Sequence, residues 1–85
     1  MVSIAVCDDE LLECISISEK IRGCMEELKI PCRVEQFYSG KELLGAVGRF
    51  DLIFLDILMD GMDGMETARR CRGLAFEKTL VFLSS

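Results

Sequence analysis

Four short segments of strand-like composition, separated by segments of helical spacing, most constrain the fold of this 85-residue chain. They are SIAVC, CRVEQF, DLIFLDI and KTLVFLSS, which begin at residues 3, 32, 51 and 78. A nearly unbroken apolar run of about five residues, as in the first and third, is typical of a strand that is covered on both faces. We therefore expect four strands, the third of them central and buried.

The segments between these strands show helical periodicity. Apolar residues recur at helical intervals from about residue 10 to residue 29, at Leu12, Ile15, Ile21, Met25 and Leu28. Ser39 is followed three residues later by Glu42, which is the capping-box pattern of a helix start. That second helix should be short because of Gly45 and Gly48, and a third is expected from about residue 65 to residue 72.

The resulting order is β-α-β-α-β-α-β. Such alternation predicts a parallel sheet with helices on both faces, and a chain of this length forms one domain at most. Sheets of this kind bind their ligands outside the carboxyl ends of the strands.

Acidic residues stand at two of those ends. Asp8 and Asp9 follow the first strand, and Asp56 ends the third. If these strands are neighbours, three carboxylates converge, and their mutual repulsion must raise a pKa or be balanced by a cation. A hard divalent ion such as Mg²⁺, which prefers oxygen ligands and keeps open positions, would suit phosphoryl transfer at such a cluster.

Composition excludes several classes of function. The formal charge of −5 disfavours direct nucleic-acid binding, and the absence of histidine excludes a Ser-His-Asp triad. No apolar stretch approaches the ~20 residues that cross a bilayer, and no signal peptide is visible, so we expect a cytoplasmic protein. The five cysteines are too widely spaced for a zinc site and are expected to be small buried hydrophobes: Cys7, Cys14, Cys24, Cys32 and Cys71.

The segments IAVCDDE, DLIFLDI, MDGMDGME and VFLSS, in this order and spacing, resemble the receiver domain of two-component response regulators. The opening and the MDGMDG loop look closest to regulators of the LytTR type, in which the receiver controls a C-terminal DNA-binding domain. The resemblance implies a flavodoxin-like, three-layer α/β fold with strand order 2-1-3-4-5. It also implies signal relay from a sensor histidine kinase to an output domain, with no metabolic enzyme activity.

The same resemblance implies roles for particular residues. Asp56 matches the phosphoacceptor, and Ser84 matches the hydroxyl that binds the phosphoryl group and couples to switching. Asp9 matches the direct Mg²⁺ ligand, Asp8 the acid that holds the ion, and the backbone carbonyl of Leu58 the main-chain ligand.

The resemblance covers the whole chain, residues 1–85, but not the whole family domain. The family continues with a fourth helix, a fifth strand carrying a lysine and a fifth helix, so we expect an incomplete domain, truncated after the fourth strand. Lys78 precedes that strand and cannot replace the lysine. A second departure is Asp60, where many receivers carry proline. An exposed fourth strand predicts self-association or marginal stability.

Two other functions stay open at this stage. One is a degenerate receiver that serves only as an interaction module, with Asp56 never phosphorylated. The other is a phosphatase or mutase with an aspartyl nucleophile, although its usual D-x-D motif would require an acid at Leu58. The Asp-Gly pairs at 60–61 and 63–64 are expected to form turns, and they lack the spacing of an EF-hand loop.

Overall fold

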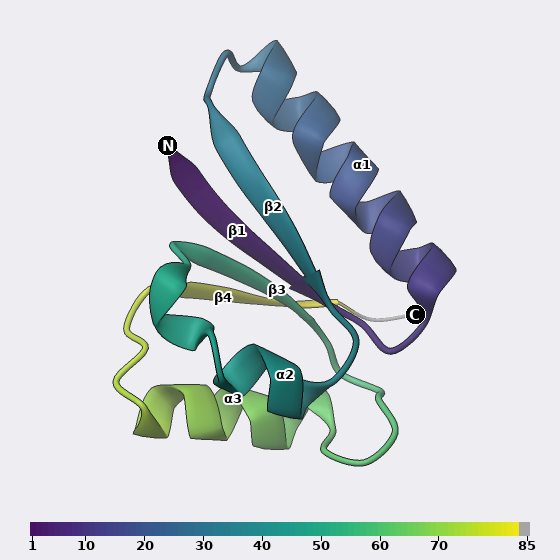
Figure 1. Cartoon of the computed structure of the whole chain (residues 1–85), viewed down its shortest axis with the longest axis vertical. Helices are drawn as coiled ribbons and strands as arrows, with labels where there is room; N and C mark the ends of the chain where they lie inside the picture. The colour runs from purple at the N-terminus through teal and green to yellow at the C-terminus, as the bar shows by residue number, and fades with distance from the viewer. Residues whose placement is uncertain (84–85) are drawn as a thin grey trace.

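The computed structural model describes residues 1–83, and within them the predicted alternation of strands and helices is present (Figure 1). The strands are β1 (Val2–Cys7), β2 (Cys32–Phe37), β3 (Leu52–Asp56) and β4 (Thr79–Leu83). The helices are α1 (Leu11–Glu27), α2 (Gly40–Leu44), the 3₁₀ turn η1 (Val47–Arg49) and α3 (Gly64–Gly73). Each predicted element is therefore found, with its ends within about two residues of the expected positions, except that the predicted end of the fourth strand at residues 84–85 lies outside the described residues.

The four strands form one parallel sheet in the order β2-β1-β3-β4. Strand β1 lies between β2 and β3, with Ile4 opposite both Val34 and Leu52. This order agrees with the first four strands of the flavodoxin-like arrangement. It places the carboxyl ends of β1 and β3 side by side.

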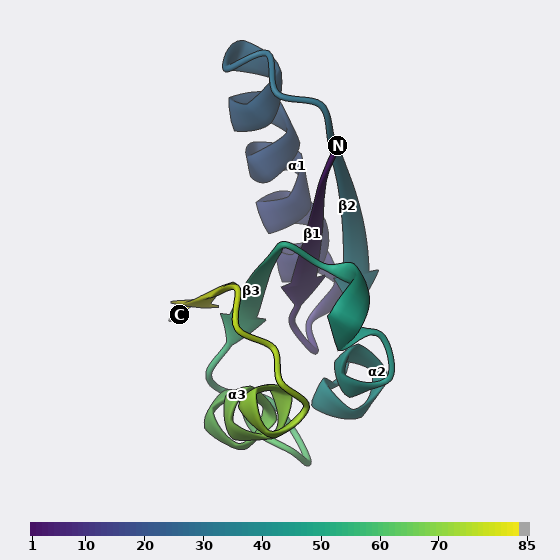
Figure 2. The same ribbon diagram turned by 90° about the vertical axis from the view of Figure 1, so that its left-hand side faces the viewer.

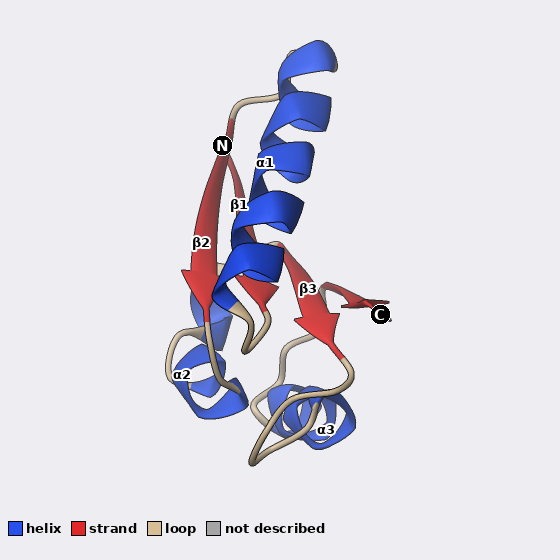
Figure 3. Cartoon of the chain, turned by 90° about the vertical axis from the view of Figure 1, so that its right-hand side faces the viewer, coloured by secondary structure: helices blue, strands red, loops and turns tan. Residues whose placement is uncertain are grey.

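Helices cover both faces of the sheet. Figure 2 and Figure 3 show α1 on one side of β1 and β2, and α2 and α3 on the other side of the sheet. The main apolar core lies between the sheet and the second pair of helices, and it contains Ala5, Cys7, Phe37, Leu43, Val47, Phe50, Ile53, Leu55, Met59, Cys71 and Phe76. The third strand contributes two fully buried side chains to it, Ile53 and Leu55. Leu52 and Phe54, on the other face of this strand, are only partly buried, so the expectation of a strand covered on both faces is wrong for that face.

The buried face of α1 differs from the predicted one. The residues fully buried in this helix are Cys14 and Ser18, whereas Leu12 and Leu28 are 80% and 66% exposed. Ser18 is tolerated there because its hydroxyl donates to the carbonyl oxygen of Cys14 over 2.7 Å. The periodicity predicted the helix correctly but placed its apolar stripe wrongly at both ends.

Helix α2 is short, and its start has the predicted cap. The backbone N–H of Glu42 donates to Oγ of Ser39 over 3.2 Å, which satisfies one free amide of the first turn. The helix ends at Leu44, and Gly45 follows it as the C-cap residue. The expectation that Gly45 and Gly48 keep this helix short is confirmed, because it ends before both of them.

The prediction that all five cysteines are buried is wrong for two of them. Cys7, Cys14 and Cys71 are buried, but Cys24 is exposed and Cys32 is partly exposed. Cys24 lies on an outer part of α1, and Cys32 is the first residue of a strand at the edge of the sheet. All five are free thiols.

Candidate functional site

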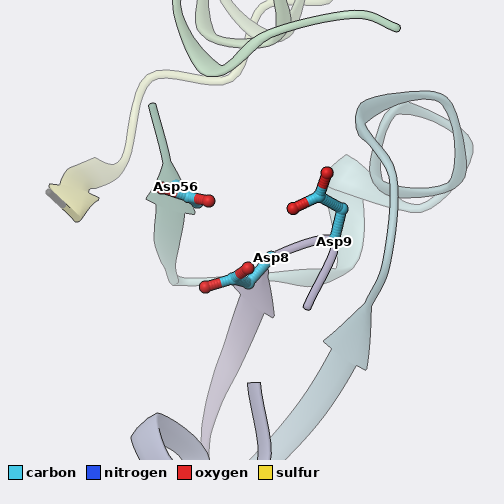
Figure 4. A group of neighbouring side chains, drawn as sticks. All are labelled: Asp8, Asp9 and Asp56. Carbon is cyan, nitrogen blue, oxygen red and sulfur yellow. The ribbon is translucent and has the colours of Figure 1, made fainter. Parts of the chain in front are cut away.

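The adjacent carboxyl ends of β1 and β3 bring three acidic side chains together (Figure 4). One carboxylate oxygen each of Asp8, Asp9 and Asp56 lies within 4.8 Å of the others. Asp8 and Asp56 are 5% and 9% exposed, and Asp9 is partly exposed. The convergence predicted from the strand ends is therefore present.

Backbone amides hold each of these carboxylates in place. The N–H of Glu10 donates to Oδ1 of Asp8 over 2.9 Å, and the N–H of Leu58 donates to Oδ1 of Asp56 over 3.3 Å. Both are Asx-type turns, in which the side chain binds the amide two residues further on. Asp9 instead accepts the N–H of Asp60, from the loop after β3, over 2.8 Å.

The end of β3 is also fixed through its backbone. The N–H of Ile57 donates to the carbonyl oxygen of Leu83 in β4 over 3.2 Å, and the N–H of Gly64 donates to the carbonyl oxygen of Ile57 over 2.9 Å. Gly64 lies so close to Asp56 that a Cβ atom there would collide with the Asp56 carbonyl oxygen. The start of α3 is therefore pressed against the strand end that carries Asp56.

The loop between β3 and α3 turns at Gly61, and its second Asp-Gly pair begins α3. Gly61 adopts a φ of 75°, which a residue without a Cβ reaches at little cost. Asp63 caps α3, because its Oδ1 accepts the N–H of Glu66 over 2.9 Å. The turn predicted at Asp60-Gly61 is confirmed, whereas the turn predicted at Asp63-Gly64 is wrong, because these residues are the cap and the first residue of α3.

Charge at this site is not balanced by any basic side chain among residues 1–83. The ion pairs there involve Glu35, Glu66 and Asp51, and none includes the three clustered aspartates. Burial raises the pKa of Asp56 above its usual value, and the charges of Asp8 and Asp9 raise it further, while the N–H of Leu58 acts in the opposite direction.

A cavity of about 440 Å³ opens beside the cluster. It is lined by Asp8, Glu10, Glu13, Ile17, Asp56, Leu58 and Leu83. A second hollow, of about 550 Å³, lies next to it over the loop after β3, and Asp9 and Asp60 line it. Both hollows are acidic and contain no basic side chain, so they favour a cation over a free anion.

The predicted site residues fall into three groups in the structure. Asp8, Asp9 and Asp56 are brought together, and Leu58 lies at the rim, where its side chain is 71% exposed. Ser84 lies outside the described residues, so its predicted role stays a prediction. The contact between Asp9 and the amide of Asp60 was not predicted, since nothing in the local sequence indicates it.

The donor set suits a hard divalent cation. The three converging groups are all carboxylates, which are ligands of the kind that Mg²⁺ selects, and nitrogen or sulfur ligands do not join the cluster that the described residues form. The adjacent cavity leaves room for water or phosphate oxygens to complete the coordination.

The comparison with protein families agrees with this geometry. The family model for the response regulator receiver domain matches residues 4–85. The chain belongs to this family. Among curated proteins, it is 35% identical over 75 residues to the cyclic di-GMP phosphodiesterase response regulator RpfG of Xanthomonas campestris pv. campestris (strain 8004). That match covers 86% of this chain and 19% of RpfG.

Solved receiver structures have the same fold. The response regulator DrrB of Thermotoga maritima, described as an OmpR/PhoB homologue, is 26% identical with a TM-score of 0.79, over 99% of this chain and 36% of DrrB. The receiver domain of the histidine kinase CKI1 from Arabidopsis thaliana, solved in complex with Mg²⁺ and BeF₃⁻, is 25% identical with a TM-score of 0.74. That match covers 98% of this chain and 65% of the other.

These comparisons support the receiver domain but not the LytTR subclass. The curated relative, RpfG, is a cyclic di-GMP phosphodiesterase by name, and this chain spans less than a fifth of its length. The type of output domain is therefore not shown. Among residues 1–83, no helix is both long and apolar enough to cross a membrane.

Proposed function

We propose that this receiver domain relays a signal by accepting a phosphoryl group on Asp56 from a sensor histidine kinase. The observation that carries the proposal is the convergence of three carboxylates within 4.8 Å at the carboxyl ends of β1 and β3, beside an open cavity. Asp56 is the acceptor because it ends the central strand and lines that cavity, where a donor can approach it.

The transfer is a displacement at phosphorus. A carboxylate oxygen of Asp56 attacks the phosphorus atom of a phosphohistidine, and the new O–P bond forms as the P–N bond breaks. The imidazole of the kinase leaves with the electron pair of that bond. The Asx turn through Leu58 and the contact with Gly64 keep the attacking carboxylate in a fixed position.

A bound Mg²⁺ ion would neutralise the carboxylates and the charge on the transferred phosphoryl oxygens. Asp9, Asp8 and Asp56 would hold it, together with the backbone carbonyl of Leu58. The all-carboxylate cluster supports this assignment, and so does the Mg²⁺ complex of the related CKI1 receiver domain.

The output of the relay is a change in a partner surface. Phosphorylation converts the Asp56 carboxylate, which carries one negative charge, into an acyl phosphate that carries about −1.5 to −2, so the site gains up to about one negative charge. Because the site lacks basic partners among the described residues, the surrounding structure must respond to this added charge. We propose that phosphorylation of Asp56 switches an attached output domain, with Ser84 coupling to the phosphoryl group.

The sequence predicted a DNA-binding output domain, and the similarity to RpfG makes a phosphodiesterase output an alternative. The chain would act in the cytoplasm as a switch, with no enzyme activity beyond its own phosphorylation and dephosphorylation.

The decisive experiment is intact mass after incubation with Mg²⁺ and the small phosphodonor phosphoramidate. Wild type should gain one phosphoryl group that hydroxylamine removes, because it is an acyl phosphate. Asp56→Asn should gain none. The matched control is Asp51→Asn, which changes the aspartate before the same strand and should be phosphorylated like wild type.

Phosphorylation of Asp56→Asn to the level of wild type would contradict the assignment of the acceptor. Complete inertness of wild type, in a sample shown by circular dichroism to be folded, would favour the alternative of a non-phosphorylated interaction module.

The outer edge of β4 is the surface we propose for self-association. Within residues 1–83, β4 pairs with β3 only, it carries no charged residue or proline, and Phe82 is 40% exposed. Wild type should sediment as more than a monomer, and Phe82→Lys should shift it towards the monomer. A monomeric wild type at high concentration would contradict this proposal.

A further inference from the structure

One hydrogen bond joins the loop after β1 to the loop after β3. The backbone N–H of Asp60 donates to Oδ2 of Asp9 over 2.8 Å, between residues 51 positions apart in the sequence. The other two clustered aspartates, Asp8 and Asp56, accept amides from their own loops. Asp9 is thus oriented by a long-range contact, and its position depends on the conformation of the second loop.

We infer that the backbone amide of Asp60 is a positioning group that aims the Asp9 carboxylate at a divalent cation. The inference rests on the proposed function, because it assumes that the cluster binds such an ion. A carboxylate has two oxygens, and the amide occupies Oδ2 and leaves Oδ1 available. Figure 4 shows the Asp9 carboxylate turned towards Asp56. A hydrogen bond to a charged acceptor is about twice as strong as a neutral one, so it can hold this orientation.

The amide acts here, and the Asp60 side chain does not. That side chain is exposed and carries the same charge as Asp9, so its electrostatic effect on Asp9 is repulsive. The useful group is the N–H, which nineteen residue types supply and proline lacks. Alanine at this position therefore keeps the donor and removes the charge, whereas proline removes both.

The contact also links the cation to the loop. If the hydrogen bond raises the affinity for the cation by some factor, the bound cation must favour the bonded state of the loop by the same factor. The loop from Ile57 to Asp63 leads directly into α3, which begins at Gly64. Binding of the ion should therefore protect the Asp60 amide from exchange with solvent.

The first experiment measures Mg²⁺ affinity by following backbone amide signals in a titration with MgCl₂ at 0.15 M salt. Asp60→Ala should bind within about twofold of wild type, whereas Asp60→Pro should bind about tenfold more weakly, as is common when a ligand loses its supporting hydrogen bond. Equal affinities of the wild type and a folded Asp60→Pro would overturn the inference and leave the proposed function intact. Absence of Mg²⁺ binding by wild type would overturn both.

The second experiment does not require the proline variant to fold. Without divalent ions, Asp9→Ala should accelerate hydrogen exchange of the residue 60 amide severalfold, because its acceptor is gone. Asp63→Asn is the matched control, since it alters another acid that binds a different amide, that of Glu66. An unchanged exchange rate at residue 60 in Asp9→Ala would overturn the inference independently of any result with Mg²⁺.

Discussion

Asp51 precedes the inner strand β3 and Asp56 is its last residue, and the surroundings of these two aspartates are opposite. The carboxylate of Asp51, before the strand, accepts a hydrogen bond from the ammonium group of Lys78 over 2.8 Å and another from the backbone N–H of Ser3 over 2.9 Å. Asp56, at the end of the strand, is more buried and faces two further carboxylates. The pKa of Asp51 lies below its usual value, chiefly because of the hydrogen bond from Lys78, whereas burial raises the pKa of Asp56.

The difference shows which end of the strand serves stability and which serves chemistry. At the amino end of the strand, the negative charge of Asp51 is neutralised by Lys78, and the hydrogen bonds of Asp51 join β1, the start of β3 and the segment before β4. At the carboxyl end like charges are held together by backbone amides, without a basic partner among the described residues. Such an arrangement costs stability in the absence of a cation and is a common sign of a functional site.

The largest expected effect on the free energy of unfolding comes from disturbing the close contact between Gly64 and the end of β3 that carries Asp56. In Gly64→Ala the new Cβ would meet the Asp56 carbonyl oxygen and lie 2.7 Å from Cα of Ile57, so the variant should lose about 1–3 kcal/mol or fail to fold. Gly48→Ala, near the other end of β3, has no atom within 4 Å of the new Cβ. It should stabilise the chain by about 0.5 kcal/mol through the unfolded state. Urea unfolding followed by circular dichroism measures both.

The contrast in packing between the two ends of β3 would be wrong if both glycine variants behaved alike. Equal losses would mean that the close approach to Asp56 is not what makes Gly64 sensitive to substitution.

Smaller effects on the midpoint of thermal unfolding, of opposite sign, are expected when each of the two aspartates is replaced by asparagine. At pH 7 in EDTA, Asp56→Asn should raise the midpoint of thermal unfolding by a few degrees, because it relieves repulsion within the cluster. Asp51→Asn should lower it, because the pair with Lys78 is lost. Calorimetry of the two variants beside wild type measures the signs, and changes of the same sign would remove the distinction between the two ends.

The two aspartates should also affect the pH dependence of stability in opposite directions, because folding raises the pKa of Asp56 and lowers that of Asp51. Since the pKa of Asp56 is raised above 3.8 by folding, the folded chain binds this proton more tightly, and stability falls as pH rises from about 3.8 through the folded pKa. Since the pKa of Asp51 is lowered, its contribution is present above pH 3.8 and is lost as pH falls through the folded pKa. The gain in Asp56→Asn should therefore disappear in acid, as should the loss in Asp51→Asn, in unfolding curves from pH 3 to 7.

The smallest effect expected is that of salt. Raising the ionic strength from about 0.1 M to 1 M shortens the screening length from about 10 Å to 3 Å. The exposed pair of Asp51 and Lys78 should weaken, so Lys78→Met should differ less from wild type at high salt. The gain in Asp56→Asn should also shrink. Unfolding curves at both salt concentrations test this, and a difference independent of salt would indicate packing as its cause.

Much of the fold was predictable because it depends on local patterns. The strand CRVEQF was predicted with its ends at Cys32 and Phe37, and the cap at Ser39 is formed as expected. The convergence of Asp8, Asp9 and Asp56 followed from a general rule, that parallel strands end at the same edge of a sheet.

What escaped prediction depends on contacts between distant residues. The bond of Asp9 to the amide of Asp60 and the pair of Asp51 with Lys78 join segments 51 and 27 positions apart. The buried stripe of α1 contains Ser18, whose polarity is hidden by a bond to its own helix, so hydropathy alone could not place it. These features require the packed structure.

The central place of β1 in the sheet has a consequence for the order of folding. This strand is synthesised before the other three strands, yet its second neighbour, β3, begins at Leu52. The unit of β1, α1 and β2 can form early through local contacts, while the pairing of Ser3 with Asp51 must close a loop of 48 residues. The acidic cluster is therefore expected to assemble late, so a nascent chain would acquire its cation site only after most of the sheet is formed.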